Sequence, residues 1–248
     1  MRTAFAVAIG GLITVTAVLA QQRSFVACPI VRDTRTVPCY LAEYEGETYF
    51  LGIQQDITSD FHPPQLKHQV LVEGTVAAGP RVCGGVPLKP VAISVIKEVD
   101  LNCDTLLPAE SGIDAPPASR GAGPSTEPLT LSRPRSLTGR QEFTVHYSFN
   151  DDYADFQAQR VIEDAAAYAK QVKASSVTIN GYRAASLLSD GQQLTEKAGL
   201  AEKRAQEVAT LLRGLGVASL TAAGKADAEP ADGKTDPSRR RVVVTVIP

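Results

Sequence analysis

The sequence predicts two folded domains of different class, an all-β domain followed by an α+β domain. Short apolar runs separated by glycine turns fill residues 24–107. Apolar periodicity stops in a Pro-rich stretch at 108–140, then resumes at 141–248 with strand and helix periods in turn. With 248 residues, the chain is long enough for two small domains or for one domain with a tail, and a hydrophobic content of 44% allows at least one core.

The first twenty residues have the pattern of a secretory signal peptide. Arg2 is followed by an uncharged, mostly apolar run from Thr3 to Ala20, and polar Gln21 comes next. This pattern predicts a signal peptide at 1–20 that is cleaved after Ala20. The alternative is an uncleaved segment that anchors the chain in the inner membrane, because about 18 apolar residues can just span a bilayer.

Four cysteines lie within the predicted β domain, and none lies after it: Cys28, Cys39, Cys83 and Cys103. An even number in one segment of an exported chain predicts two disulfides. Three pairings are possible, and the spacing does not choose among them. The cysteines form no Cys-x-x-Cys pair and the histidines are not at ligand spacing, so we expect neither a metal site nor a cofactor.

The segment at 24–107 is predicted to be a small barrel or sandwich of short strands. Residues 40–44 and 47–51 flank a glycine turn and predict a hairpin. Residues 70–76 predict a further strand in which Gly74 forms a bulge, and residues 91–96 predict another. The order of these strands, with a glycine inside the third, loosely resembles an OB-like barrel.

Residues 108–140 predict a linker. Prolines alternate there with glycine, serine and alanine, and apolar periodicity is lost. Such a composition favours an extended chain without a core of its own. The linker is therefore expected to separate two independent units.

The segment at 141–248 alternates between strand and helix patterns. Apolar side chains alternate with polar ones in the first strand, and apolar residues recur at helical spacing after it. Asp151 and Asp152 stand between the two and are predicted to cap the first helix. The predicted elements are a strand at 143–149, a helix at 162–172, a strand at 177–179, a helix at 201–212 and a strand at 242–247, with a further candidate strand near Leu220.

Several short motifs in this segment together carry a family resemblance: Gly181-Tyr182, the Leu200–Val208 helix with Arg204-Ala205, Leu215-Gly216-Val217 and Arg240-Arg241-Val242. In order and spacing they resemble the peptidoglycan-associating C-terminal domain of the OmpA family, over residues about 141–248. The resemblance implies an α+β sandwich of β-α-β-α-β order. It also implies binding of the diaminopimelate side chain in the stem peptide of peptidoglycan.

A zwitterionic amino-acid end needs an anion for its ammonium group and a cation for its carboxylate. A guanidinium grips a carboxylate with two parallel hydrogen bonds. The resemblance places Arg204 at the position of the family's arginine. The family's aspartate would stand at Ala184, so Asp190 is the candidate anion from an offset position. Lys197 and Arg239 replace two asparagines of the family pattern.

Each candidate binding residue also has a structural alternative. Arg204 is alternatively a structural arginine that pairs with Glu207 or with the terminal strand. Asp190 precedes Gly191 and is alternatively a turn residue. The run Arg239–Arg241 predicts a solvated strand edge that resists aggregation, with a grip on glycan or lipid headgroups as the alternative.

We expect that the protein is not an enzyme, because the sequence has neither a nucleophile elbow nor a metal-binding motif. A formal net charge of −2 gives no general attraction to nucleic acid. The sequence predicts a periplasmic cell-envelope protein, associated with the cell wall or outer membrane, whose partners are peptidoglycan and envelope proteins. A membrane is a partner only if the leader is retained. The alternative is an OmpA-like scaffold that has lost its glycan pocket and serves as a protein–protein interaction module.

Overall fold

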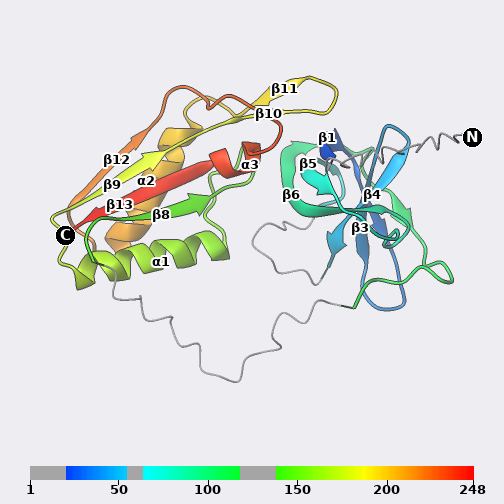
Figure 1. Ribbon diagram of the computed structural model, residues 1–248, viewed down its shortest axis with the longest axis horizontal. Coiled ribbons are helices and arrows are strands. Elements are labelled where there is room, and N and C mark those ends of the chain that lie inside the picture. Colours follow the sequence, from blue (N-terminus) through cyan, green and yellow to red (C-terminus); the bar gives the residue numbers. More distant parts are fainter. Residues whose placement is uncertain (1–20, 55–63, 118–137) are drawn as a thin grey trace, which may run out of the picture.

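The computed structural model describes residues 21–54, 64–117 and 138–248, which form a β unit and an α+β unit side by side (Figure 1). The predicted signal peptide and most of the predicted linker lie outside these residues, so both stay predictions. Within the three described ranges, no helix is long and apolar enough to cross a membrane.

Strands alone build the β unit: β1 (Gln22–Ala27), β2 (Pro29–Arg32), β3 (Cys39–Tyr44), β4 (Glu47–Ile53), β5 (His68–Val76), β6 (Val86–Val99) and β7 (Leu106–Leu107). They form a seven-stranded sheet of order β1-β5-β6-β4-β3-β2-β7. The predicted hairpin is confirmed as β3 and β4. The register between β5 and β6 shifts from Gly74 to Val76, an irregularity at the place predicted for a bulge or bend, with the extra residue in β6.

The OB-like barrel is not confirmed. In this sheet β1 and β7 are the two ends of the strand order, so the pairing does not close into a ring. The long strand β6 pairs antiparallel with β5 and parallel with β4, and it thereby joins two groups of strands. The class, a small all-β unit, is as the sequence predicts.

Two disulfides brace the β unit, which confirms their predicted number. The pairs are Cys28–Cys103 and Cys39–Cys83, with sequence separations of 75 and 44 residues. Cys39 and Cys83 are buried in a small cluster with Leu41. Closing loops of this length restricts the unfolded chain and so stabilises a unit with a small core.

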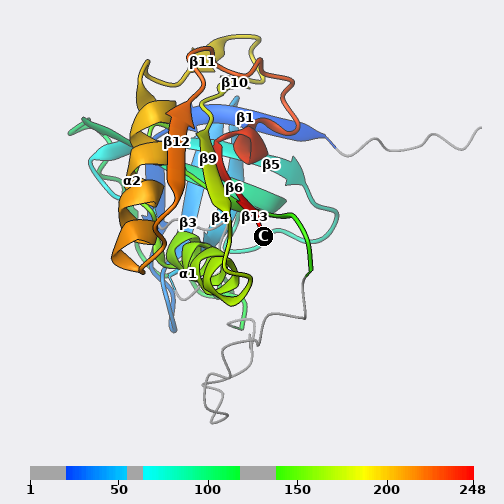
Figure 2. The same cartoon turned by 90° about the vertical axis from the view of Figure 1, so that its left-hand side faces the viewer.

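The α+β unit contains the predicted elements and a few more. Its elements are β8 (Gln141–His146), α1 (Phe156–Gln171), β9 (Ser176–Gly181), β10 (Ala185–Leu187), β11 (Gln193–Thr195), α2 (Leu200–Gly214), β12 (Leu220–Gly224), α3 (Asp236–Arg239) and β13 (Arg241–Ile247). The main sheet has four strands in the order β12-β9-β13-β8, and β10 and β11 form a small sheet of their own. Figure 2 shows α1 and α2 beside the main sheet.

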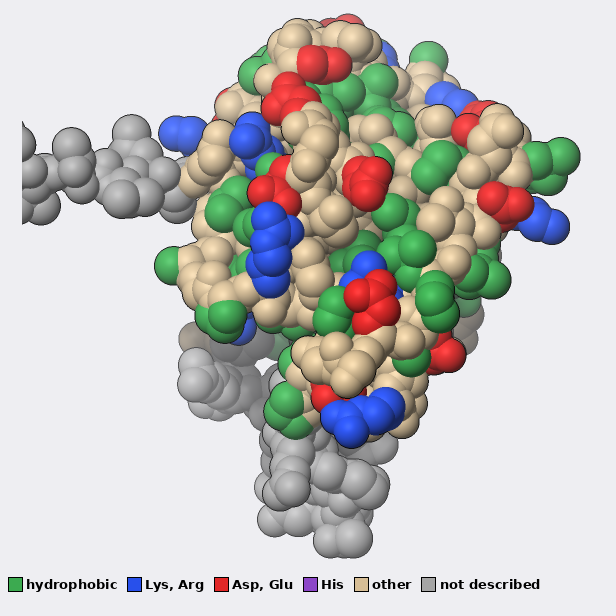
Figure 3. Space-filling view, turned by 90° about the vertical axis from the view of Figure 1, so that its right-hand side faces the viewer, with side chains coloured by type: hydrophobic (Ala, Val, Ile, Leu, Met, Phe, Trp, Pro, Cys, Tyr) green, Lys and Arg blue, Asp and Glu red, His purple; other side chains and the backbone are tan. Residues whose placement is uncertain are grey.

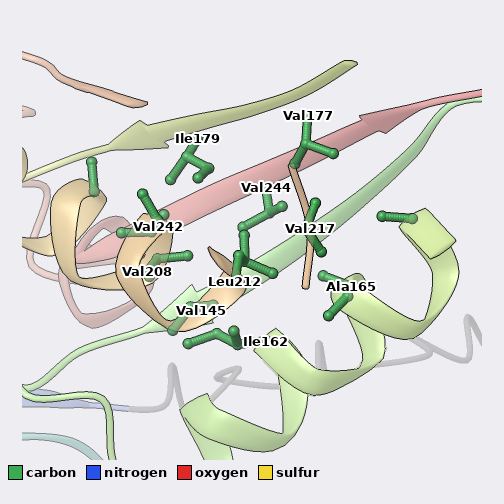
Figure 4. Close-up of a cluster of buried hydrophobic side chains, with 14 of the residues drawn as sticks. Val145, Ile162, Ala165, Val177, Ile179, Val208, Leu212, Val217, Val242 and Val244 are labelled. Carbon is green, nitrogen blue, oxygen red and sulfur yellow. The ribbon is translucent and has the colours of Figure 1, made fainter. Parts of the chain in front are cut away.

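One hydrophobic core joins this sheet to both helices. Alternate residues of a strand point to the same face, so the buried residues of β9 and β13 meet the apolar faces of α1 and α2. Figure 4 shows these side chains interleaved: Val145, Ile162, Ala165, Val177, Ile179, Val208, Leu212, Val217, Val242 and Val244.

The helix ends follow local chemistry. Helix α1 begins after Asp155, whose carboxylate accepts a hydrogen bond from the Ala158 N–H at 2.8 Å. The predicted cap at Asp151 and Asp152 is therefore wrong by about one turn of helix. Helix α2 is followed by Gly216 at φ 85°, a left-handed conformation that ends the helix.

The two units contact each other through polar groups. The Ser189 N–H donates to the Ser24 carbonyl at 2.7 Å, and the Phe149 N–H donates to Ser94 Oγ at 2.8 Å. The guanidinium of Arg240 pairs with the carboxylate of Glu73 at 2.6 Å. The composition of the linker does not indicate that the two units contact each other. The prediction of two independent units does not include this contact.

Candidate functional site

Arg204 lies on α2, close to the end of β9. Glycine allows this approach, because a Cβ at Gly181 would lie 1.9 Å from the carbonyl oxygen of Ala201. Helix α2 therefore packs directly on the backbone of β9. The side chain of Arg204 is 0% exposed, and its guanidinium donates to the Tyr182 carbonyl at 3.0 Å.

The guanidinium of Arg204 is fully used within the chain. Its Nε donates to the Asp151 carbonyl at 2.7 Å, and Nη2 donates to the Ser148 carbonyl at 3.1 Å. Nη1 and Nη2 grip the carboxylate of Glu196 at 3.0 and 2.6 Å. With the bond to Tyr182 these contacts engage all five N–H donors of a guanidinium. In this arrangement no donor remains for an external carboxylate.

Glu196 directly follows β11 and lies beside the guanidinium of Arg204. Its carboxylate is buried and accepts hydrogen bonds from the N–H groups of Ala184 at 2.8 Å and Asn150 at 3.0 Å. Ala184, where the resemblance would place an aspartate, is 0% exposed and therefore closed to solvent. A carboxylate from the segment after β11 thus supplies the anion that Ala184 lacks.

Aromatic and acidic groups surround this ion pair. The Arg204 guanidinium lies 4.8 Å from the ring centroid of Tyr147, a distance typical of a cation–π contact. Burial raises the pKa of the Tyr147 hydroxyl, and the nearby charge of Glu207 adds to the shift. Glu207, one partner predicted for a structural Arg204, instead accepts a hydrogen bond from the Ala154 N–H at 3.3 Å. The partner that sequence reasoning missed is Glu196.

Asp190 has the geometry of a turn residue. It is exposed between β10 and β11, and its carboxylate accepts a hydrogen bond from the Gln192 N–H at 2.9 Å. Gly191 follows at φ 88°. Asp190 and Lys197 line a cleft of about 390 Å³ between the units, whereas Arg204 does not line it. The structure therefore does not bring the two predicted site residues together.

The arginine run at the start of β13 is not a solvated edge as a whole. Arg240 is 1% exposed, and it binds the Glu73 carboxylate at 2.6 and 3.2 Å and Ser186 Oγ at 2.9 Å. Arg241 binds Glu229 at 2.8 and 2.9 Å. The signal that sequence reasoning missed was Glu73, a single carboxylate inside an apolar strand. A buried charge of this kind needs a partner.

The described contacts of the Arg204 site are hydrogen bonds, an ion pair and a cation–π contact. Among the described residues, the one cluster of metal-ligand types is Cys28, Asp100 and Cys103, and its two cysteines are joined in a disulfide. Acidic and basic side chains are interspersed on the face of the molecule that Figure 3 draws. That face offers no broad basic surface of the kind that binds nucleic acid.

No family model and no curated protein matches this chain. Among solved structures, it is similar to the OmpA-like domain of FopA1 from Francisella tularensis, with 25% identity over 45% of this chain and 76% of that one, at a TM-score of 0.35. It is also similar to the peptidoglycan-associated lipoprotein from Burkholderia pseudomallei, with 22% identity, coverage of 42% and 89%, and a TM-score of 0.35.

A third similar structure is the periplasmic domain of MotB from Helicobacter pylori, with 15% identity, coverage of 46% and 79%, and a TM-score of 0.31. These TM-scores are low, so the functional proposal rests on the geometry of this chain's own residues. That geometry defines the class of the C-terminal unit. It is an α+β unit with a buried guanidinium that holds a carboxylate.

Proposed function

We propose that this chain is a non-catalytic protein of the cell envelope that associates non-covalently with peptidoglycan through its α+β unit. The observation that carries the proposal is the bidentate grip of Arg204 on a carboxylate. Backbone carbonyls hold the rest of the guanidinium in place, so the grip is preorganised. A stem-peptide carboxylate would bind there by replacing that of Glu196.

This association is weak, because Glu196 competes for the same donors. Removing one partner of a buried ion pair costs about 3–5 kcal/mol. A ligand carboxylate must restore that energy and also displace the segment that carries Glu196. Affinity is therefore set by the balance between an internal and an external carboxylate for one arginine.

A second candidate function is favoured by the closure of the same site. If Glu196 never leaves, Arg204 is a structural arginine and the unit is a scaffold that binds envelope proteins. Full use of the Arg204 donors and the burial of Ala184 both support this candidate. The two candidates predict different binding to peptidoglycan when the negative charge of Glu196 is removed.

The deciding experiment is sedimentation of residues 21–248 with purified sacculi, with and without free diaminopimelate. Glu196→Gln removes the charge of the internal competitor while keeping its shape. We expect this variant to bind sacculi about tenfold more tightly than the wild type, and diaminopimelate to release it. Glu163→Gln changes an exposed glutamate on α1 and should behave as wild type.

A thermal melt of each variant establishes that it is folded before its binding is compared. If folded wild type and folded Glu196→Gln both stay in the supernatant, association through Arg204 is refuted and the interaction module remains. Binding that diaminopimelate does not release would also exclude the Arg204 clamp as the site of association.

A further inference from the structure

Two segments that close the Arg204 site are tied to each other. Residues 148–152 supply two backbone carbonyls that accept hydrogen bonds from Arg204, and the segment after β11 supplies the carboxylate of Glu196. The N–H of Asn150 donates to Glu196 at 3.0 Å, and the side-chain Oδ1 of Asn150 accepts from the N–H of Lys197 at 2.8 Å. These bonds couple the positions of the two segments.

Strand β6 of the β unit holds the first segment. The N–H of Phe149 donates to the buried hydroxyl of Ser94 at 2.8 Å. The ammonium group of Lys97 pairs with the carboxylate of Asp151 at 2.9 Å. Phe149 and Asp151 stand on either side of the N–H that donates to Glu196. Strand β6 therefore fixes the backbone around this N–H.

Strands β6 and β1 hold the second segment. Glu98 of β6 accepts a hydrogen bond from the ammonium group of Lys197 at 3.0 Å, and Lys197 directly follows Glu196. Before Glu196, the hairpin of β10 and β11 extends from the α+β unit toward β1 (Figure 1). There Ser24 and Ser189 exchange two hydrogen bonds, at 2.7 and 2.9 Å. The β unit thus contacts the chain on both sides of this internal carboxylate.

Most of these contacts are of a kind that can be released. The side chains of Lys97, Glu98 and Lys197 are 57%, 67% and 65% exposed, and exposed ion pairs contribute little to stability individually. A cleft of about 390 Å³ is lined by residues of the 188–197 segment and of β1, β3 and β6. Apolar packing between this segment and the β unit is therefore incomplete.

We propose that the docked β unit inhibits the Arg204 site. While β1 and β6 hold the two segments, Glu196 stays on the guanidinium and excludes an external carboxylate. Release of β6 lets Glu196 leave and opens the site. Coupling between two sites is reciprocal, so a carboxylate bound to Arg204 in turn weakens the docking of the β unit. This regulation rests on the proposed binding of a stem-peptide carboxylate at Arg204.

Amide hydrogen exchange tests the inhibition without peptidoglycan, in the same chain that is used for sedimentation. The double variant Lys97→Ala/Glu98→Ala removes both exposed ion pairs of β6. The N–H groups of Asn150 and Ala184 both donate to Glu196. We expect them to exchange about three- to tenfold faster in the double variant than in wild type, because the closed arrangement loses the support of two exposed pairs.

A matched control separates this effect from a general change in charge. The double variant Glu47→Ala/Arg81→Ala also removes one acid and one base, from an exposed pair within the β unit, and it should leave both rates unchanged. The N–H of Val208, in the buried face of α2, should exchange as in wild type in both double variants. Its unchanged rate distinguishes local release from unfolding of the α+β unit.

Sedimentation with sacculi separates the inhibition from the clamp. The variant Lys97→Ala/Glu98→Ala should bind about three- to tenfold more tightly than wild type, and diaminopimelate should release it. Exchange as in wild type at both amides, or faster exchange at Asn150 alone, overturns the inhibition.

Glu196→Gln provides the remaining comparison. If this variant binds sacculi and Lys97→Ala/Glu98→Ala binds no better than wild type, the inhibition is overturned and the clamp stands. If both amides exchange faster and Glu196→Gln stays in the supernatant, the proposed association with peptidoglycan fails. Control of the Arg204 site by the β unit is then still supported.

Discussion

Arg204 and Arg240 are the largest fully buried side chains among the described residues, and each is held by a glutamate. A buried charge is tolerated only when its partner and its remaining hydrogen bonds are in place. Arg204 joins three segments of the α+β unit, whereas Arg240 joins that unit to the β unit. Arg204 therefore stabilises the α+β unit itself, and Arg240 stabilises the contact between the two units.

Arg204→Ala should lower the free energy of unfolding by about 3–5 kcal/mol, because it leaves Glu196 buried without its cation. Arg213→Ala, at an exposed position of the same helix, should change it by no more than about 0.5 kcal/mol. Denaturant unfolding of both variants measures the difference. Equal stability of the two variants would contradict a structural role for the Arg204 pair.

Glu207 predicts a pH-dependent effect. Burial raises its pKa above the ordinary value of 4.5, so folding disfavours the ionised form. The contribution of the Glu207 carboxyl group to the free energy of unfolding is therefore fully present below pH 4.5. It is lost as the pH rises through the raised pKa of the folded state. Glu207→Gln stays neutral, so it should melt like wild type at about pH 3.5 and at a higher temperature at about pH 7.

Melting temperatures across this pH range, with Glu163→Gln as the exposed control, check the prediction. A Glu207→Gln variant that melts below wild type at neutral pH would show that the ionised carboxylate is stabilising. The bond that Glu207 accepts from the Ala154 N–H would then outweigh the effect of burial.

At the scale of elements, two glycines set the distance between α2 and the sheet. A Cβ at Gly181 would lie 1.9 Å from the Ala201 carbonyl oxygen, and one at Gly224 would lie 2.2 Å from the Glu202 nitrogen. Both glycines end strands, β9 and β12, that pair in parallel. The start of α2 therefore rests on the ends of these two strands, which brings Arg204 within reach of Tyr182.

Gly181→Ala should destabilise the chain by about 1–3 kcal/mol or more, because the atoms it meets are backbone and cannot rotate away. Gly214→Ala, near the end of α2, has open space around its added methyl group. It should stabilise the helix by about 0.5–1 kcal/mol. Thermal melts of the two variants measure both changes in stability. A Gly181→Ala variant that is as stable as wild type would contradict the close packing.

At the scale of the whole molecule, the β unit and the α+β unit are docked rather than merely tethered. Polar contacts of Ser24, Ser94 and Glu73 reach the α+β unit from the β unit. The Glu73–Arg240 pair is nearly dry, with side chains 6% and 2% exposed. Removing one partner of a buried ion pair strongly destabilises the protein, because the other charge stays buried without a partner.

Limited proteolysis tests the docking. The Pro-rich composition predicts cleavage within residues 109–140. The two wild-type fragments should then elute together in size-exclusion chromatography. Glu73→Ala should let them separate, since Arg240 would stay buried without its anion, whereas Glu47→Ala, which removes an exposed pair with Arg81, should not. Separate elution of the wild-type fragments would contradict a stable interface.

Local patterns in the sequence determined much of the fold. Alternation predicted the hairpin of β3 and β4 and the strands β5, β8 and β13, because side chains of a strand point to alternate faces. Helical spacing and Gly216 determined α2 and its end. The number of disulfides followed from four cysteines in one segment of a chain with a predicted export signal.

Only the tertiary structure decided which distant groups meet. Cysteine pairing and the docking of the two units depend on residues far apart in the chain, with separations of 44 and 75 for the disulfides and 167 for Arg240 with Glu73. Glu196 lies eight residues before Arg204 in the sequence, but no periodic pattern marks it as the partner. Periodicity reports which face of an element is buried, and it carries no information about what lies opposite. In sequence, Arg204 fits either a clamp or a structural pair; only the folded chain places the buried carboxylate of Glu196 against its guanidinium.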